Sequence, residues 1–111
     1  MSKGFKGLPP NLSGIMKKAQ QMQEQLQKIK EEASSYVGEG SAGGGMVKVT
    51  ANSNHELLTV RISAELLSGG DVEMLQDLVL AASNEALKKA DAVLQDKMSE
   101  ITGGSDLQGM L

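Results

Sequence analysis

Residues 11–36 read NLSGIMKKAQQMQEQLQKIKEEASSY, and this stretch decides how the chain folds. Its apolar residues are spaced alternately by four and three positions, which places them on one face of a helix. This seam, whose residues are possible dimer contacts, consists of Ile15, Ala19, Met22, Leu26, Ile29 and Ala33. The remaining positions are mainly glutamine and lysine, which favour helix. We therefore predict a helix on the order of 35 Å long, part of which projects from the domain or packs against a second copy.

After this helix the sequence predicts a three-stranded antiparallel sheet. Five glycines between residues 38 and 45 end the helix, because glycine is unfavourable in a helix interior. Alternating β-branched residues predict strands at 46–51 and 57–62, joined by a turn at 52–55. A short extended piece around residues 35–40 is expected to pair with the first of these strands across the glycine segment. In the last strand, the expected alternation puts one set of side chains on one face and the second set on the other. The first set is Leu58, Val60 and Ile62, and the second is Leu57, Thr59 and Arg61.

A second long helix is predicted to complete the domain. Residues 64–67 are expected to form a single helical turn before a Ser-Gly-Gly break. Asp71 is a good N-cap, and apolar residues follow helical spacing from Val72 to about Thr102. Gly103 then ends the helix, as glycine commonly does just past a last turn. The predicted fold class is α+β, with the order helix, three strands, helix.

The length of 111 residues is typical of one domain, which we place at residues 11–102. Residues 1–10 are expected to form a flexible basic arm and residues 103–111 a flexible tail. Phe5 and Tyr36 are the only aromatic residues, so the core has to be aliphatic. A chain with so little bulky apolar material gains stability most readily by burying surface in an oligomer, and we expect a homodimer.

Several classes of function are disfavoured by the sequence. It contains no cysteine and no run of about eighteen apolar residues, so we expect a cytoplasmic protein with no membrane partner. Residues 38–43 match GxGxxG, but they lead into a predicted strand instead of a helix, so we interpret them as a flexible hairpin loop. His55 is the only histidine and lies in a predicted turn without metal-ligand neighbours. No convergent carboxylate pair is visible, so we expect no enzyme activity, cofactor, metal or small-molecule substrate.

Charge is divided unevenly along the chain. The net charge is −3, but residues 1–30 carry +5 and residues 31–111 carry −8. The bases in the first part are Lys3, Lys6, Lys17, Lys18, Lys28 and Lys30, against the single acid Glu24. A helix that needed only solubility would interleave Glu with Lys, whereas this one has glutamines there. Lysine and glutamine together suit a surface that lies along phosphates, and the lack of aromatic platforms favours duplex over single-stranded DNA.

A second class of function stays open at this point. Lysine-rich faces usually serve only solubility. In that case the chain would be a structural or interaction protein whose apolar seam docks a helix of a partner protein.

Three blocks of the sequence point to a known family. They read IMKKAQQMQE at 15–24, GEGSAGGGMVKV at 38–49, and EMLQDLV with AASNEA between residues 73 and 86. In their order and spacing, which together cover roughly residues 12–102, they resemble the YbaB/EbfC family of bacterial nucleoid-associated DNA-binding proteins.

The resemblance implies a homodimer of tweezer-like shape, whose projecting long helices approach DNA. It also implies that the protein coats or bridges chromosomal DNA in the nucleoid and influences gene expression without catalysis. Lys17 and Lys18 occupy the family's motif and are the DNA-contacting residues that the resemblance supports best. The other four lysines are predicted from charge alone.

Overall fold

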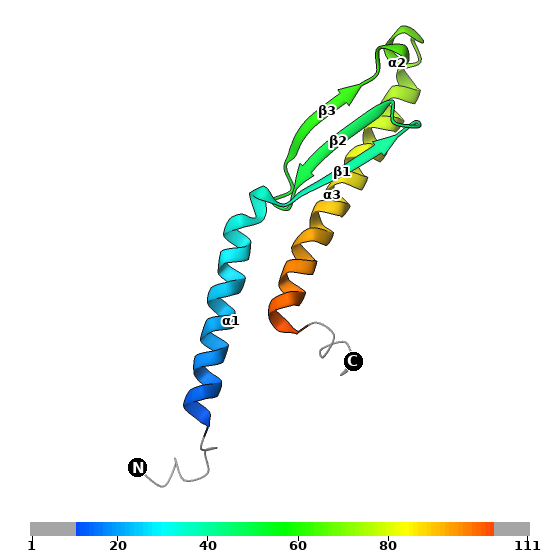
Figure 1. The fold of residues 1–111 in the computed structure, drawn as a ribbon. Helices are drawn as coiled ribbons and strands as arrows, with labels where there is room; N and C mark the ends of the chain where they lie inside the picture. The colour runs from blue at the N-terminus through cyan, green and yellow to red at the C-terminus, as the bar shows by residue number, and fades with distance from the viewer. Residues whose placement is uncertain (1–10, 104–111) are drawn as a thin grey trace.

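The computed structural model describes residues 11–103, and it shows a helix, three strands and a long C-terminal helix in that order (Figure 1). The elements are α1 (Leu12–Glu32), the 3-10 helix η2 (Ala33–Ser35), β1 (Val37–Ala42), β2 (Val47–Asn52), β3 (Leu57–Ile62), α2 (Ala64–Ser68) and α3 (Val72–Thr102). The predicted α+β class and order of elements are confirmed. The predicted arm at residues 1–10, and the predicted tail from residue 104 onward, lie outside the described residues.

The first helix ends earlier than predicted. α1 stops at Glu32, and the chain tightens into η2 before reaching extended backbone at Tyr36. The Ser35 hydroxyl donates a 2.7 Å hydrogen bond to the Glu32 carbonyl, and such side-chain bonds compete with continued helix. Asn11 stands at the N-cap position, but its side chain makes no capping hydrogen bond.

The strands form one antiparallel sheet in the order β1, β2, β3. β1 lies slightly later than the extended piece predicted around residues 35–40. The interpretation of the glycine segment as a flexible loop is wrong for its first half, because Gly38 and Gly40 lie within β1. Only residues 43–45 form the turn to β2, and all three have positive φ angles that suit glycine.

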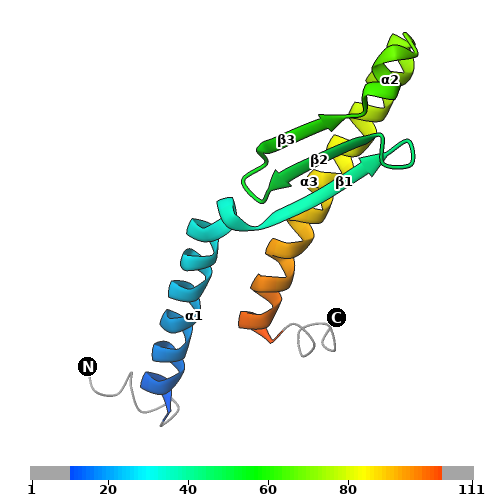
Figure 2. The ribbon, with the colours of Figure 1, turned by 45° about the horizontal axis from the view of Figure 1, so that its top comes forward.

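The core lies between α3 and the first two strands, and Figure 2 shows α3 running along the sheet. Three alanines of α3, spaced four residues apart, are 0% exposed: Ala82, Ala86 and Ala90. The two strand glycines face them. A Cβ atom added to Gly40 would lie 2.1 Å from the Ala82 carbonyl oxygen, and one added to Gly38 would lie 2.2 Å from the Ala90 nitrogen. Helix and strand therefore approach at backbone distance, which only glycine facing alanine permits.

β3 pairs with β2 with one irregularity. Arg61 lies directly opposite Lys48, as strict alternation requires. A register shift between Thr50 and Ala51 then pairs Ala51 with Leu57. The predicted alternation of inward and outward side chains thus holds from residue 59 to 62 but fails at the start of the strand, where a bulge inserts one residue.

The ends of α3 are capped as predicted. The Asp71 carboxylate accepts a 3.0 Å hydrogen bond from the backbone N–H of Met74. Gly103 has a φ of 64° at the other end, which is the left-handed conformation that terminates many helices. The turn predicted at residues 64–67 is the short helix α2. Between residues 11 and 103, none of the helices combines the length and apolar character needed to cross a membrane.

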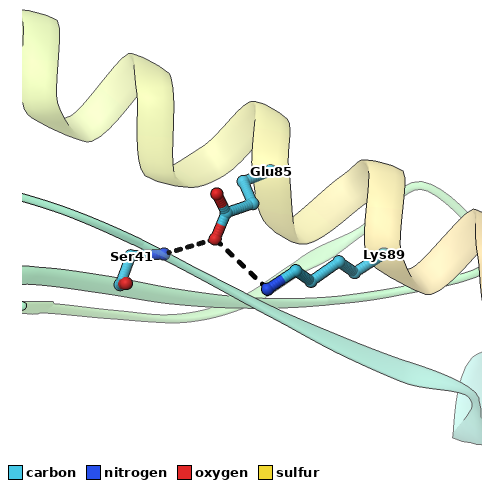
Figure 3. Close-up of polar contacts among 3 residues, drawn as sticks. All are labelled: Ser41, Glu85 and Lys89. Atoms are coloured by element: carbon cyan, nitrogen blue, oxygen red, sulfur yellow. Dashed lines mark hydrogen bonds and ion pairs between the residues drawn. The ribbon is translucent and has the colours of Figure 1, made fainter.

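A side chain from α3 reaches the outer edge of β1 (Figure 3). The Glu85 carboxylate accepts a 3.2 Å hydrogen bond from the Ser41 backbone N–H, and the Lys89 ammonium lies 3.4 Å from the same oxygen. The Ser41 N–H chiefly, and Lys89 second, hold the pKa of Glu85 below its usual value. Glu85 thus satisfies a backbone donor that would otherwise remain open on an edge strand.

Candidate nucleic-acid interface

α1 lies beside the C-terminal part of α3, and its N-terminal end extends past the end of α3 (Figure 1). Burial along the predicted seam follows this arrangement. Ile29 and Ala33 are buried, whereas Ile15 is 51% exposed. From the buried to the exposed end, the seam residues are Ala33, Ile29, Leu26, Met22, Ala19 and Ile15. The fold therefore covers only the C-terminal part of the seam.

The four α1 lysines predicted to contact DNA are all exposed: Lys17, Lys18, Lys28 and Lys30. Lys3 and Lys6 lie outside the described residues. At about 100° per residue, Lys17 and Lys28 lie on the face opposite the seam. Lys18 and Lys30 lie on the two flanks of the seam. The lysines therefore surround α1 and do not form a single basic stripe.

The N-terminal half of α1 is its more positive part. Lys17 and Lys18 are its only charged residues from position 12 to 23, and the first turn contains no acid. The partial positive charge of a helix N-terminus adds to them. In the C-terminal half, by contrast, Lys28 has Glu24 four residues before it and Glu32 four residues after it. These acids reduce the attraction that Lys28 exerts on a polyanion.

None of these four lysines is held in an ion pair by another residue of the described part of the chain. The one ion pair within residues 11–103 joins Glu85 to Lys89 on α3. The α1 ammonium groups are thus free to approach an external anion.

The inner face of β3 is left uncovered. Val60 and Ile62 point to the same side of the sheet as the fully buried Val47 and Val49, which lie opposite them in β2. Val60 is nevertheless 46% exposed. The cause is that α3 packs against β1 and β2 and does not extend over β3.

Exposed apolar side chains also occur on α3. Leu80 is 62% exposed, and Leu87, seven residues further on, is half-buried on the same helix face. We refer to the exposed and half-buried apolar residues of these two elements, Val60 and Ile62 of β3 with Leu80 and Leu87 of α3, as the apolar corner.

No group of three or more metal-ligating side chains is suitably placed within residues 11–103. His55 lies exposed in the turn between β2 and β3, as predicted, with a φ of 63°.

Two features were missed from the sequence. The first is the pair Lys48 and Arg61, which the register places side by side on the outer face of the sheet. The second is the uncovered inner face of β3. Alternation within each strand was visible, but the cross-strand register and the path of α3 were not. Both depend on how the elements pack.

The chain is similar to known proteins over nearly its whole length. Residues 8–105 match the model of the YbaB/EbfC DNA-binding family. A nucleoid-associated protein of Caldanaerobacter subterraneus subsp. tengcongensis is 45% identical over 112 residues, covering 99% of each chain. A nucleoid-associated protein of Clostridium novyi is 45% identical over 109 residues, covering 96% of each chain.

Among solved structures, an uncharacterized protein from Helicobacter pylori is similar to this chain. It has a TM-score of 0.54 and 28% sequence identity, over 71% of this chain and 88% of its own.

Proposed function

The chain belongs to the YbaB/EbfC DNA-binding family, and from this premise we propose that it is a nucleoid-associated protein that binds double-stranded DNA as a homodimer. It acts in the cytoplasm, on chromosomal DNA, by organising that DNA or modulating gene expression, and it performs no catalysis. The observation that carries the proposal is the projecting, acid-free N-terminal half of α1, with Lys17 and Lys18 exposed on it.

The chemistry of α1 favours contacts to phosphates over contacts to bases. Its cations are all lysines, and an ammonium is a point charge without the planar fork by which arginine reads guanine. Lysines that lie on several sides of a helix also suit contact with the DNA phosphate backbone better than contact with the base edges in one groove. We expect binding with little sequence preference.

The open apolar corner supports the homodimer. β3 is an edge strand of the sheet, and its inner face is uncovered at Val60 and Ile62. A second copy related by a two-fold axis presents the same edge and the same corner, including Leu80 and Leu87 of α3. Joining two such corners covers apolar surface in both chains. We place the main dimer interface here, since the buried part of the α1 seam already contacts α3 of its own chain.

Changing Val60 to Thr is expected to weaken the dimer. Threonine keeps the β-branched shape but buries a hydroxyl at the interface, once in each subunit, so the dissociation constant should rise by about tenfold. Sedimentation velocity over a concentration series measures this constant. Val37→Thr is the matched control, because Val37 is 47% exposed on the opposite edge strand and should leave the dimer unchanged. A larger effect from Val37→Thr would place the interface at β1.

Titration of duplex DNA of unrelated sequence with the purified protein, at several salt concentrations, tests the DNA-binding function. Each phosphate contact should contribute a slope of about −0.9 to the plot of log association constant against log salt. A backbone binder should therefore show a slope of several units and similar affinity for unrelated sequences. Absence of binding at low salt would contradict the proposal.

The alternative function is the docking of a partner protein on the exposed end of the seam, around Ile15 and Ala19. The exposure of these residues is the observation in its favour. An apolar contact of this kind would be nearly insensitive to salt, or would strengthen with it.

A further inference from the structure

We propose that the outer face of the sheet is a second phosphate-binding surface for duplex DNA, centred on Lys48 of β2 and Arg61 of β3. The inference rests on the proposed DNA-binding function. It adds a contact surface on the opposite side of the sheet from α3, at residues that the lysine-rich sequence of α1 does not include.

The first observation is an unrelieved pair of like charges. Lys48 and Arg61 are directly opposite each other across the β2 and β3 ladder, and both are exposed. They are the only lysine or arginine residues between positions 31 and 87. Like charges directly opposite in a sheet destabilise it. Neither forms an ion pair within residues 11–103, although Glu39 lies on the same face. A bound anion would remove this repulsion.

The second observation is the set of hydroxyl groups beside the two cations. The Thr50 and Thr59 hydroxyl oxygens lie 2.6 Å apart, one row further along the same strands. Their mutual hydrogen bond uses one hydroxyl proton, so the other remains able to donate to a phosphate oxygen. Lysine, arginine and threonine are all common donors to the DNA backbone.

The third observation is the shape of the surface. A hollow of about 390 Å³ lies over these strands, lined by Glu39, Lys48, Thr50, Thr59 and Arg61. The lining contains no apolar or aromatic side chain that would hold a nucleobase or a lipid chain. Glu39 would repel a small free anion that entered the hollow alone. A polyanion that places one phosphate between Lys48 and Arg61 is held by its other contacts with the protein as well, which favours DNA as the ligand.

The position of this surface has a mechanical consequence. α1 leaves the sheet at the start of β1 and extends away from the strands (Figure 1). The α1 lysines and the outer face of the sheet are therefore separate surfaces on one subunit. When DNA occupies both surfaces, one protein molecule contacts two DNA segments or two parts of one bent segment.

The test compares two double variants in the same DNA titration. Lys48→Gln with Arg61→Gln removes both cations from the sheet, and Lys88→Gln with Lys97→Gln removes the same charge from exposed positions on α3. The sheet variant should reduce the salt slope by about 0.9 for each lost contact, that is by roughly 2 per subunit, and lower affinity at least tenfold at 0.1 M salt. The α3 variant should change both quantities much less.

A second measurement does not depend on any variant. Adding duplex DNA to the wild-type protein should shift the NMR amide signals of Thr50 and Thr59, and 10 mM inorganic phosphate should shift them much less. Equal affinity of wild type and sheet variant, or equal losses in both variants, would overturn the inference. Saturation by phosphate without an effect on DNA affinity would assign the site to a free anion and also overturn it. Failure of the wild type to bind DNA would instead overturn the proposed function.

Discussion

Replacing Gly40 with alanine is expected to lower the free energy of unfolding by at least about 3 kcal/mol, which is a large fraction of the stability of a small domain. The added Cβ would lie 2.1 Å from the carbonyl oxygen of Ala82 and 2.5 Å from the backbone nitrogen of Ala86. Both neighbours are backbone atoms of α3, which cannot rotate away as a side chain does. The strand can accept the methyl group only by moving off the helix, and this would open the core.

Gly14→Ala is the matched control. Gly14 lies within α1, and an added Cβ would meet nothing within 4 Å. Alanine is favoured over glycine in a helix by about 0.5–1 kcal/mol, so this variant should be unchanged or slightly stabilised. Urea denaturation followed by circular dichroism measures both variants. If Gly40→Ala is as stable as Gly14→Ala, β1 does not contact α3 at backbone distance.

The second large effect is expected from reversing the charge of Lys17 and Lys18 together. Each change to glutamate removes a proposed phosphate contact and adds a repulsive charge near the DNA. Affinity at 0.1 M salt should fall by about 100-fold or more for all sequences alike, with a salt slope smaller by about 2 per subunit. The circular dichroism spectrum and the oligomeric state in solution should not change, because both side chains are exposed.

Charge reversal at Lys88 and Lys97 provides the control for this experiment. These residues are also exposed lysines on a helix, but they lie on α3 among acids such as Asp91 and Asp96. Their reversal changes the net charge by the same amount and should cost much less affinity. Equal losses in the two variants would show that net charge, and not the N-terminal half of α1, attracts the DNA.

The elements of the fold were predictable because each has a strong local signal. Spacings of three and four define α1 and α3, β-branched alternation defines β2 and β3, and Asp71 and Gly103 mark the ends of α3. β1 was placed less accurately because its glycines resemble a loop. Their role becomes visible only when α3 brings Ala82, Ala86 and Ala90 against them. That contact joins residues more than forty positions apart.

The candidate interface was only partly predictable for the same reason. Runs of charge on one helix are visible in the sequence, so Lys17 and Lys18 could be chosen as candidates directly, and their contact with DNA stays a prediction. Lys48 and Arg61 become neighbours only through the register of β2 with β3. The uncovered Val60 depends on where α3 stops covering the sheet. Contacts between segments that are far apart in the sequence leave no periodic pattern of residues by which they could be predicted.

The gradual exposure of the α1 seam separates turns that pack against the core from turns that do not. The exposed N-terminal turns make few tertiary contacts, and a helix segment of that length has little stability of its own in water. These turns can unwind locally without unfolding the sheet and α3. Substitutions at Lys17, Lys18 and their neighbours should therefore change the proposed DNA-contacting surface at almost no cost to global stability. The contact between Gly40 and Ala82, by contrast, leaves no room for a side chain at Gly40.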